Sequence, residues 1–189
     1  GSTDINGGSI RTIGAQTYND AVTLSADSIL TSTDSNVSFN GTINSATTTA
    51  RNLTLNIGTG TVAFGNDSTD TIGASAALAA IAITGNLDLN AAIVNAASLS
   101  VSRATDLGAN VTTSGTQTYN GALILSISHP SLISNSGGII IKDNITDSIS
   151  SDFVINSGSH STVINGDIDS LSSLTIDSSA IDSVINGVI

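Results

Sequence analysis

The sequence contains no cysteine, methionine or tryptophan, and it has one proline in 189 residues. Without cysteine the chain has no disulfide framework and no thiolate chemistry. Aromatic residues make up only 3% of the chain, which disfavours a thick sandwich core and favours slender coils filled by isoleucine, leucine, valine and alanine. No apolar run is long enough to span a bilayer, so we expect no membrane insertion.

Basic residues are also scarce. Four lysines and arginines oppose fifteen acidic residues, all of them aspartate, and the net charge is -11. Such a surface repels phosphate backbones, so we expect no nucleic-acid partner. The abundant threonine, valine, isoleucine, asparagine, aspartate, serine and glycine suit short strands joined by turns better than helices. The composition therefore predicts an all-β fold.

One segment of the chain occurs twice. Residues 14–24 return as residues 115–125 with seven of eleven positions identical. A segment that recurs in this way indicates an array whose units stack on one another. The motif residues that recur are Gly14, Gln16, Tyr18 and Asn19 in the first copy, and Gly115, Gln117, Tyr119 and Asn120 in the second.

The repetition continues along the rest of the chain in the same order. The further matches are Val37–Ile43 with Ile139–Ile145, Leu53–Gly58 with Phe153–Gly158, Thr61–Gly65 with Thr162–Gly166, and Leu78–Ile83 with Leu171–Ile176. The offset stays near 101 and drops to 93 (171 minus 78) at the last match, so about eight residues within 67–77 are missing from the second copy. We assign copy one to residues 11–111 and a shortened copy two to residues 112–189, within one continuous body.

Apolar residues alternate with polar ones in short segments, which predicts strands with one buried face. The predicted inward pairs are Val22/Leu24, Val37/Phe39, Leu53/Leu55, Val62/Phe64, Ile81/Ile83, Leu87/Leu89 and Leu99/Val101. Residues that tolerate a left-handed backbone separate these segments and predict corners. The predicted corners are Asn19-Asp20, Asn40-Gly41, Gly65-Asn66, Gly85-Asn86 and Asn120-Gly121.

Asn-Gly corners also suit antiparallel hairpins, so a meander or barrel competes with a solenoid. The repetition favours the solenoid, because stacked coils of about 20 residues bring similar side chains into register. We predict a right-handed parallel β-helix of about eight or nine coils, about 40 Å long. Residues 74–82 have a helical composition, but the match of Leu78–Ile83 to Leu171–Ile176 favours a strand there.

The two Gly-x-Gln-Thr-Tyr-Asn segments, with Asn52–Gly58 and Ala80–Gly85 between them, resemble repeats of giant Gram-negative surface exoproteins. The resemblance is to filamentous haemagglutinin-like adhesins exported by two-partner secretion, and it covers nearly the whole chain, more loosely after Leu125. It implies a right-handed β-helix that serves as the stalk of an adhesin. The motif is specific for the repeat and carries no information about a ligand.

The recurring motif itself has a structural and a binding interpretation. In a strand, Gln16 and Tyr18 point to one side and Thr17 to the other, and Asn19 closes the turn. Tyr18 and Tyr119 would then pack their rings near a corner with the hydroxyl wet or hydrogen bonded. The alternative is that these rings stack on a glycan.

Catalysis finds little support in the sequence. Right-handed β-helices include polysaccharide lyases and hydrolases, which need clustered aspartates with a basic residue or a pair of carboxylates. Asp167 and Asp169 alternate on one strand face, Asp177 and Asp182 follow, and Lys142 is the sole lysine. No phosphate loop, zinc spacing or Ser-His-Asp arrangement accompanies them. We therefore assign no catalytic residue.

Calcium is the one cofactor that the acidic side chains suggest, because clustered aspartates can share a hard cation. The competing interpretation is a solvated acidic face that maintains solubility and discourages lateral association. The candidate ligands are Asp143, Asp147, Asp152, Asp167 and Asp169.

These observations lead to one functional hypothesis and two alternatives. We expect a non-enzymatic stalk or spacer of a secreted or surface-anchored bacterial adhesin, with a weak binding face, on the outer cell surface. Its partners would be neighbouring β-helix repeats and a host or bacterial surface protein or glycan. The alternatives are a β-helical polysaccharide lyase or hydrolase, and a glycan-binding module.

Overall fold

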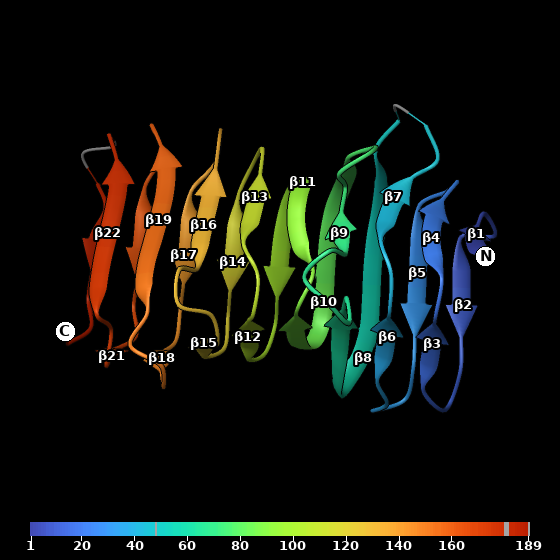
Figure 1. The fold of residues 1–189 in the computed structure, drawn as a ribbon, viewed down its shortest axis with the longest axis horizontal. Helices are drawn as coiled ribbons and strands as arrows, with labels where there is room; N and C mark the ends of the chain where they lie inside the picture. Colours follow the sequence, from blue (N-terminus) through green and yellow to red (C-terminus); the bar gives the residue numbers. More distant parts are fainter. Residues whose placement is uncertain (48, 180–181, 189) are drawn as a thin grey trace.

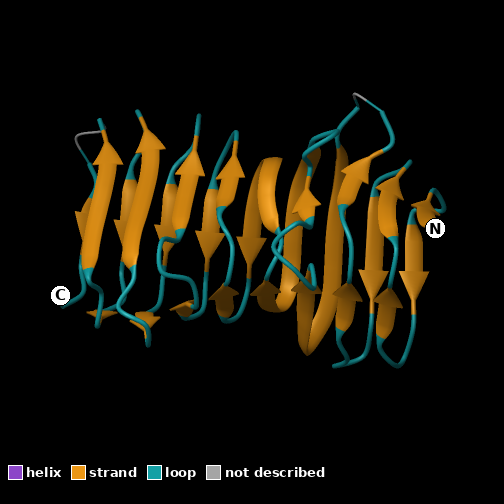
Figure 2. Ribbon diagram, in the orientation of Figure 1, coloured by secondary structure: helices purple, strands orange, loops and turns teal. Residues whose placement is uncertain are grey.

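In the computed structural model, which describes residues 1–47, 49–179 and 182–188, the chain forms 23 strands and no helix. The strands join into one sheet through parallel pairings. They lie across the long axis of the molecule, with the N-terminus at one end and the C-terminus at the other (Figures 1 and 2). The all-β prediction is confirmed, and no described strand forms the antiparallel pairing of a meander.

The winding chain builds three faces, each a ladder of parallel strands, with β8, β10 and β11 bending to contribute to two faces each. Face 1 contains β1 (Ser2–Ile5), β4 (Ala21–Leu24), β7 (Ile43–Ser45), β9 (Thr71–Ile72), the start of β11 (Ala92–Val101), β13 (Val111–Thr113), β16 (Ser131–Ser134), β19 (Asp152–Gly158) and β22 (Ser173–Ser178). Face 2 contains β2 (Ser9–Arg11), β5 (Ser28–Thr31), the starts of β8 (Arg51–Phe64) and β10 (Leu78–Leu89), the end of β11, β14 (Gln117–Tyr119), β17 (Ile139–Ile141), β20 (Thr162–Ile164) and β23 (Val184–Ile185). Face 3 contains β3 (Gln16–Tyr18), β6 (Val37–Phe39), the ends of β8 and β10, β12 (Thr105–Leu107), β15 (Leu123–Leu125), β18 (Ile145–Asp147) and β21 (Ile168–Asp169).

The three faces make a parallel β-solenoid of about nine turns. Neighbouring turns are offset by 17 residues (Ala96 to Thr113) to 29 residues (Ile43 to Ile72), so the coil length varies around the predicted 20. In Figure 1 the near strands of face 1 run upward while the chain advances from right to left. This sense of winding is right-handed, as predicted.

Inward side chains fill the interior in rows. On face 2 one such row passes through Leu30, Leu55, Ile83, Val101 and Tyr119, all of them buried. Every inward pair predicted from the sequence is buried, and the predicted corners lie where the chain passes from one face to the next. Of the segment with helical composition, residues 78–82 begin β10, which confirms the strand prediction, and residues 74–77 form a bend before it.

The two repeat copies lie on the same axis but not on the same faces. We count strand segments along the winding, with β8, β10 and β11 counting twice, so that three segments make one turn. The first Gln-Thr-Tyr motif is then segment three, on β3, and the second is segment seventeen, on β14. The two motifs are therefore fourteen segments apart, which is four and two-thirds turns. Each element of copy two therefore lies one face earlier than its counterpart in copy one.

One match between the copies was wrong by a single residue. The sequence comparison paired Val62 and Phe64 with Val163 and Asn165, but Val62 and Phe64 are buried whereas Val163 is partly exposed and Asn165 exposed. The inward residues of β20 are Thr162 and Ile164. Because side chains alternate between faces, a shift of one residue moves the whole set to the other side of the strand.

Candidate functional site

The Gln-Thr-Tyr motif of copy one forms a closed hydrogen-bond network on β3. Gln16 and Tyr18 point inward and Thr17 points outward, as predicted. Gln16 Nε2 donates to Thr12 Oγ1 at 3.1 Å and to the carbonyl oxygen of Thr31, one turn further on, at 2.9 Å. Tyr18 OH donates to Gln16 Oε1 at 3.0 Å. The motif thus ties one turn to the next.

The same network recurs in copy two, on face 2. Gln117 Nε2 donates to Thr113 Oγ1 at 3.1 Å and to the carbonyl oxygen of Ile133 at 2.8 Å. Tyr119 OH donates to Gln117 Oε1 at 3.0 Å. Buried polar groups need hydrogen-bond partners. The glutamine and tyrosine of the motif bond to each other and to a nearby threonine, so the motif can be buried on either face.

The two tyrosines differ in burial. Tyr119 is 0% exposed, whereas Tyr18 lies half-buried at the N-terminal end and stacks on Phe39 with ring centroids 4.9 Å apart. Burial raises the pKa of both hydroxyls, so both stay neutral hydrogen-bond donors. A ring enclosed like that of Tyr119 has no surface on which a sugar can stack.

The motif glycines and asparagines also serve the backbone. The carbonyl oxygens of Gly14 and Gly115 each accept a threonine hydroxyl at 2.6 Å. A Cβ on Gly115 would lie 2.8 Å from the carbonyl oxygen of Ala97, so glycine allows two turns to approach closely.

The motif asparagines close corners. Asn40 Nδ2 donates to Asn19 Oδ1 at 2.9 Å, and Asn120 Nδ2 donates to the carbonyl oxygen of Val101 at 2.7 Å. Each bond joins neighbouring turns. The motif residues thus hold the coil together, with the exception of Gly14, whose hydrogen bond from Thr12 stays within one turn.

Several aspartates that the sequence analysis did not single out join successive turns. Asp27 Oδ1 accepts the backbone N–H of Asn52 at 3.0 Å, and Asp34 Oδ1 accepts that of Thr59 at 2.9 Å. These bonds lower the pKa of both carboxyl groups. The sequence signal is weak: each aspartate lies in one of the two corners that flank the short strand β5.

The five candidate calcium ligands do not converge on one point. Among the described residues, no group of three His, Cys, Asp or Glu side chains could hold a metal ion. Asp147 is 8% exposed and accepts the backbone N–H groups of Ile149, at 2.9 Å, and Ser151. Burial opposes ionisation, but these hydrogen bonds outweigh it and lower the pKa of Asp147.

Two other candidates have partners of their own. Asp143 Oδ1 accepts the N–H of Asn144 at 2.8 Å. Asp152 accepts the hydroxyl of Ser173 at 2.8 Å and lies 3.6 Å from His129 Nε2, and the hydrogen bond lowers the pKa of its carboxyl. These carboxylates are engaged in contacts within and between turns.

The remaining pair, Asp167 and Asp169, was also the best catalytic candidate. The two residues flank the inward Ile168 and help to line a shallow hollow of about 340 Å³. Asp167 Oδ1 accepts the N–H of Val188 at 2.9 Å. Lys142 is exposed at a neighbouring corner, and no ion pair joins it to either carboxylate among the described residues.

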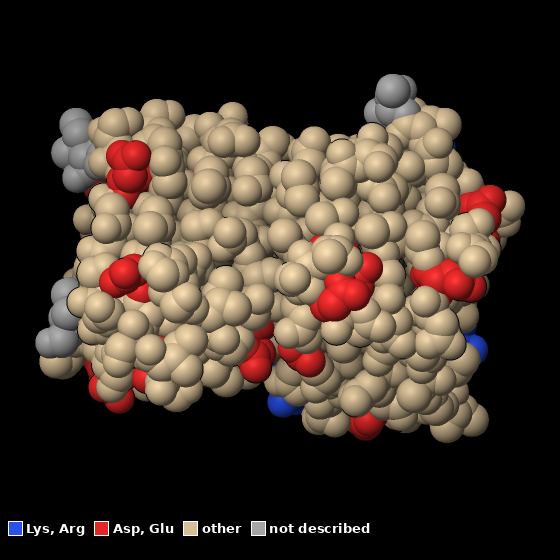
Figure 3. All heavy atoms as spheres, viewed as in Figure 1, with Lys and Arg blue, Asp and Glu red and all other residues tan. Residues whose placement is uncertain are grey.

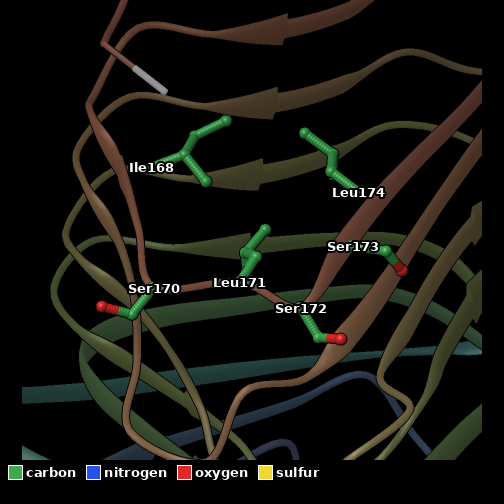
Figure 4. A pocket seen from close by; sticks show the side chains of 6 residues that line it. All are labelled: Ile168, Ser170, Leu171, Ser172, Ser173 and Leu174. Atoms are coloured by element: carbon green, nitrogen blue, oxygen red, sulfur yellow. The ribbon is translucent and has the colours of Figure 1, made fainter.

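Another hollow, of about 260 Å³, opens at the C-terminal end of the rod. Figure 4 shows Ile168, Leu171 and Leu174 directed into it. Leu171 and Leu174 are half-buried against the core, because no described turn covers them. The hollow is the uncovered end of the apolar interior. Its lining contains no charged residue.

The space-filling view shows carboxylates in separate small groups, with basic atoms only near the margins (Figure 3). The described residues contain no helix that could cross a membrane. A scan against protein-family models and searches of curated proteins and solved structures return no match. The structure is therefore a β-solenoid. Most of the residues that the sequence analysis selected as candidates form contacts that hold its turns together.

Proposed function

We propose that this chain is a non-enzymatic stalk or spacer segment of a secreted bacterial surface adhesin. One observation carries the proposal: a buried apolar core extends along the rod from Ile5 to Ile168, and most of the polar residues singled out by the sequence hold its turns together. A rod of this kind transmits position and force, because each turn contacts only its neighbours.

The resemblance of the repeat to filamentous haemagglutinin-like adhesins supports an extracellular location on the outer surface of a bacterium. The repeated Gln-Thr-Tyr segments carry this resemblance, and their network is the one that joins successive turns. Neighbouring repeats, and a host or bacterial surface protein or glycan, are the proposed partners.

A spacer must keep its ends at a fixed distance. Single-molecule fluorescence energy transfer between dyes at the two termini should give one narrow distribution near about 40 Å, from nine rungs of about 4.8 Å. A broad distribution that shifts with denaturant well below the unfolding transition would contradict the proposal, because it would describe a flexible tether.

The enzyme alternative is tested by incubating the chain with acidic polysaccharides and measuring newly formed reducing ends. We expect none. Turnover that disappears in both Asp167→Asn and Asp169→Asn, while a matched Asp177→Asn variant keeps it, would replace the spacer with a lyase or hydrolase.

A further inference from the structure

Face 2 carries an unbroken outward row from Ser9 on β2 to Val184 on β23, one residue from each of nine strands. The row contains only serine, threonine, alanine, isoleucine and valine. The outward rows of the other faces include aspartates, such as Asp4 on face 1 and Asp88 on face 3. The central outward row of face 2 is thus uncharged on a molecule with a net charge of -11, and the arginines of its strands, Arg11 and Arg51, lie at strand ends.

The last three rungs of this row are aliphatic. Ile140, Val163 and Val184 lie in register on β17, β20 and β23. In copy one, the counterparts of the first two are Ser38 and Ala63, which lie on face 3. The stripe therefore distinguishes copy two from copy one at these positions. Ile140 and Val163 are partly exposed and Val184 is 42% exposed, and accessible aliphatic side chains in a contiguous row mark interaction surfaces.

Charged residues border face 2 at its two corners, and they are distributed unevenly along the rod. In the first five turns they are Arg11, Arg51, Arg103, Asp27 and Asp34. In the last four turns they are Lys142, Asp143, Asp167 and Asp182. Three cations and two aspartates thus border one half, against one cation and three aspartates at the other. When two copies of face 2 pack antiparallel, the more basic half of each lies against the more acidic half of the other.

We propose that face 2 is an interface at which two molecules of this chain pack face to face and antiparallel. Nine rungs of about 4.8 Å and a width of about five residues give about 600 Å² per molecule, close to the lower end of specific interfaces. The small and β-branched side chains let two sheets approach to about 10 Å. The other two faces would bring aspartates of both molecules together, so they are disfavoured as interfaces.

The first test is sedimentation of the wild type and two matched variants. Ile140→Asp places a carboxylate in the stripe, whereas Ile124→Asp makes the same change at an outward position of β15 on face 3, where Ile124 is 39% exposed. We expect a wild-type dimer, an unchanged dimer for Ile124→Asp, and at least a tenfold weaker association for Ile140→Asp. Circular dichroism checks that both variants fold.

The orientation is tested with single cysteines, since the chain has none of its own. Ser100, on the fifth rung of the row, faces its own counterpart in an antiparallel pair, so Ser100→Cys should form disulfide-linked dimers. Ser9→Cys should not, but a mixture of Ser9→Cys and Val184→Cys should form mixed dimers.

Three results would overturn the proposal. The first is a wild-type monomer at about 100 μM, a concentration at which even weak specific interfaces associate. The second is a series of growing oligomers that Ile140→Asp leaves unchanged, because this would place the contact at the ends of the rod. The third is efficient self-linking of Ser9→Cys, which requires parallel packing.

Discussion

Copy one and copy two contain the same motif in two different settings. In copy one the motif lies on face 3 in the first turn, with Tyr18 half-buried at the end of the rod. In copy two it lies on face 2 in the sixth turn, with Tyr119 fully buried. The hydrogen bonds within the motif are the same in both copies. The hydrogen-bond network is therefore determined by the local sequence. The face on which the motif lies is determined by the number of strand segments that precede it.

The largest difference between the copies is expected on removing the tyrosine ring. Tyr119→Ala should lower the free energy of unfolding by about 4 kcal/mol, because it leaves a large cavity in the core. Tyr18→Ala should cost less than half as much, since its ring is already partly in water. Urea denaturation of the two variants measures both values. Equal losses would contradict this prediction, because they would show that Tyr18 at the end of the rod is packed as tightly as Tyr119 in its middle.

Removing only the hydroxyl sharpens the same comparison. Tyr119→Phe leaves Gln117 Oε1 buried without its donor, and we expect a loss of about 2 kcal/mol. Tyr18→Phe should change the stability by less than about 0.5 kcal/mol, because the Tyr18–Gln16 hydrogen bond is only partly buried. A neutral Tyr119→Phe variant would argue against the buried network.

A third pair of positions predicts a gain in stability. Thr105 lies inward between Leu87 and Leu123, and its Oγ1 is buried without a hydrogen-bond partner among the described residues. Thr105→Val should raise the free energy of unfolding by about 1 kcal/mol, because the isosteric methyl group needs no partner. Its counterpart fourteen segments earlier is Thr3, which is half-buried, and Thr3→Val should be neutral. Thermal unfolding compares the two.

The smallest predicted effect depends on pH. Asp147 of copy two replaces Ser45 of copy one, and its pKa is lowered in the folded state. A lowered pKa contributes stability that is present above the unfolded value of about 3.9 and is lost as the pH falls through the folded value.

Asp147→Asn should therefore cost about 1 kcal/mol at pH 7, because the accepted hydrogen bonds lose their charge. The cost should fall as the pH drops below about 3.9, where the unfolded carboxyl becomes protonated. Ser45→Asn serves as the control, since its effect should not depend on pH. Urea denaturation at pH 7 and at pH 2 gives the comparison, and a cost as large at pH 2 as at pH 7 would rule out this origin.

The sequence predicted the strands well because their patterns are local. Alternation at Leu53/Leu55 or Leu99/Val101 identifies an inward pair, and residues such as Asn40-Gly41 identify a corner. The distribution of the copies over the faces was not predicted. It depends on how many segments make up the repeat, and a corner within a continuous strand that was not predicted, such as residues 57–60 in β8, conceals that number.

The one-residue error at Val163 has a related cause. Thr162 points inward, where its hydroxyl lies 2.9 Å from Ser157 Oγ, so the polar residue is buried and the apolar one is exposed. From polarity alone, Val163 would be placed inward and Thr162 outward. The roles of Asp27 and Asp34 were missed because their partners lie 25 residues away and come close only when the coils stack.

The most direct test of the rotated repeat is the distance between spin labels on pairs of outward residues, with labelled protein diluted into unlabelled protein. Ser100 and Thr118 are neighbours on face 2, so labels there should lie within about 10 Å and broaden the spectrum strongly. Asp106 and Thr118 lie on different faces and should show little broadening. Strong broadening for Asp106 and Thr118 together with weak broadening for Ser100 and Thr118 would contradict the arrangement of the two copies.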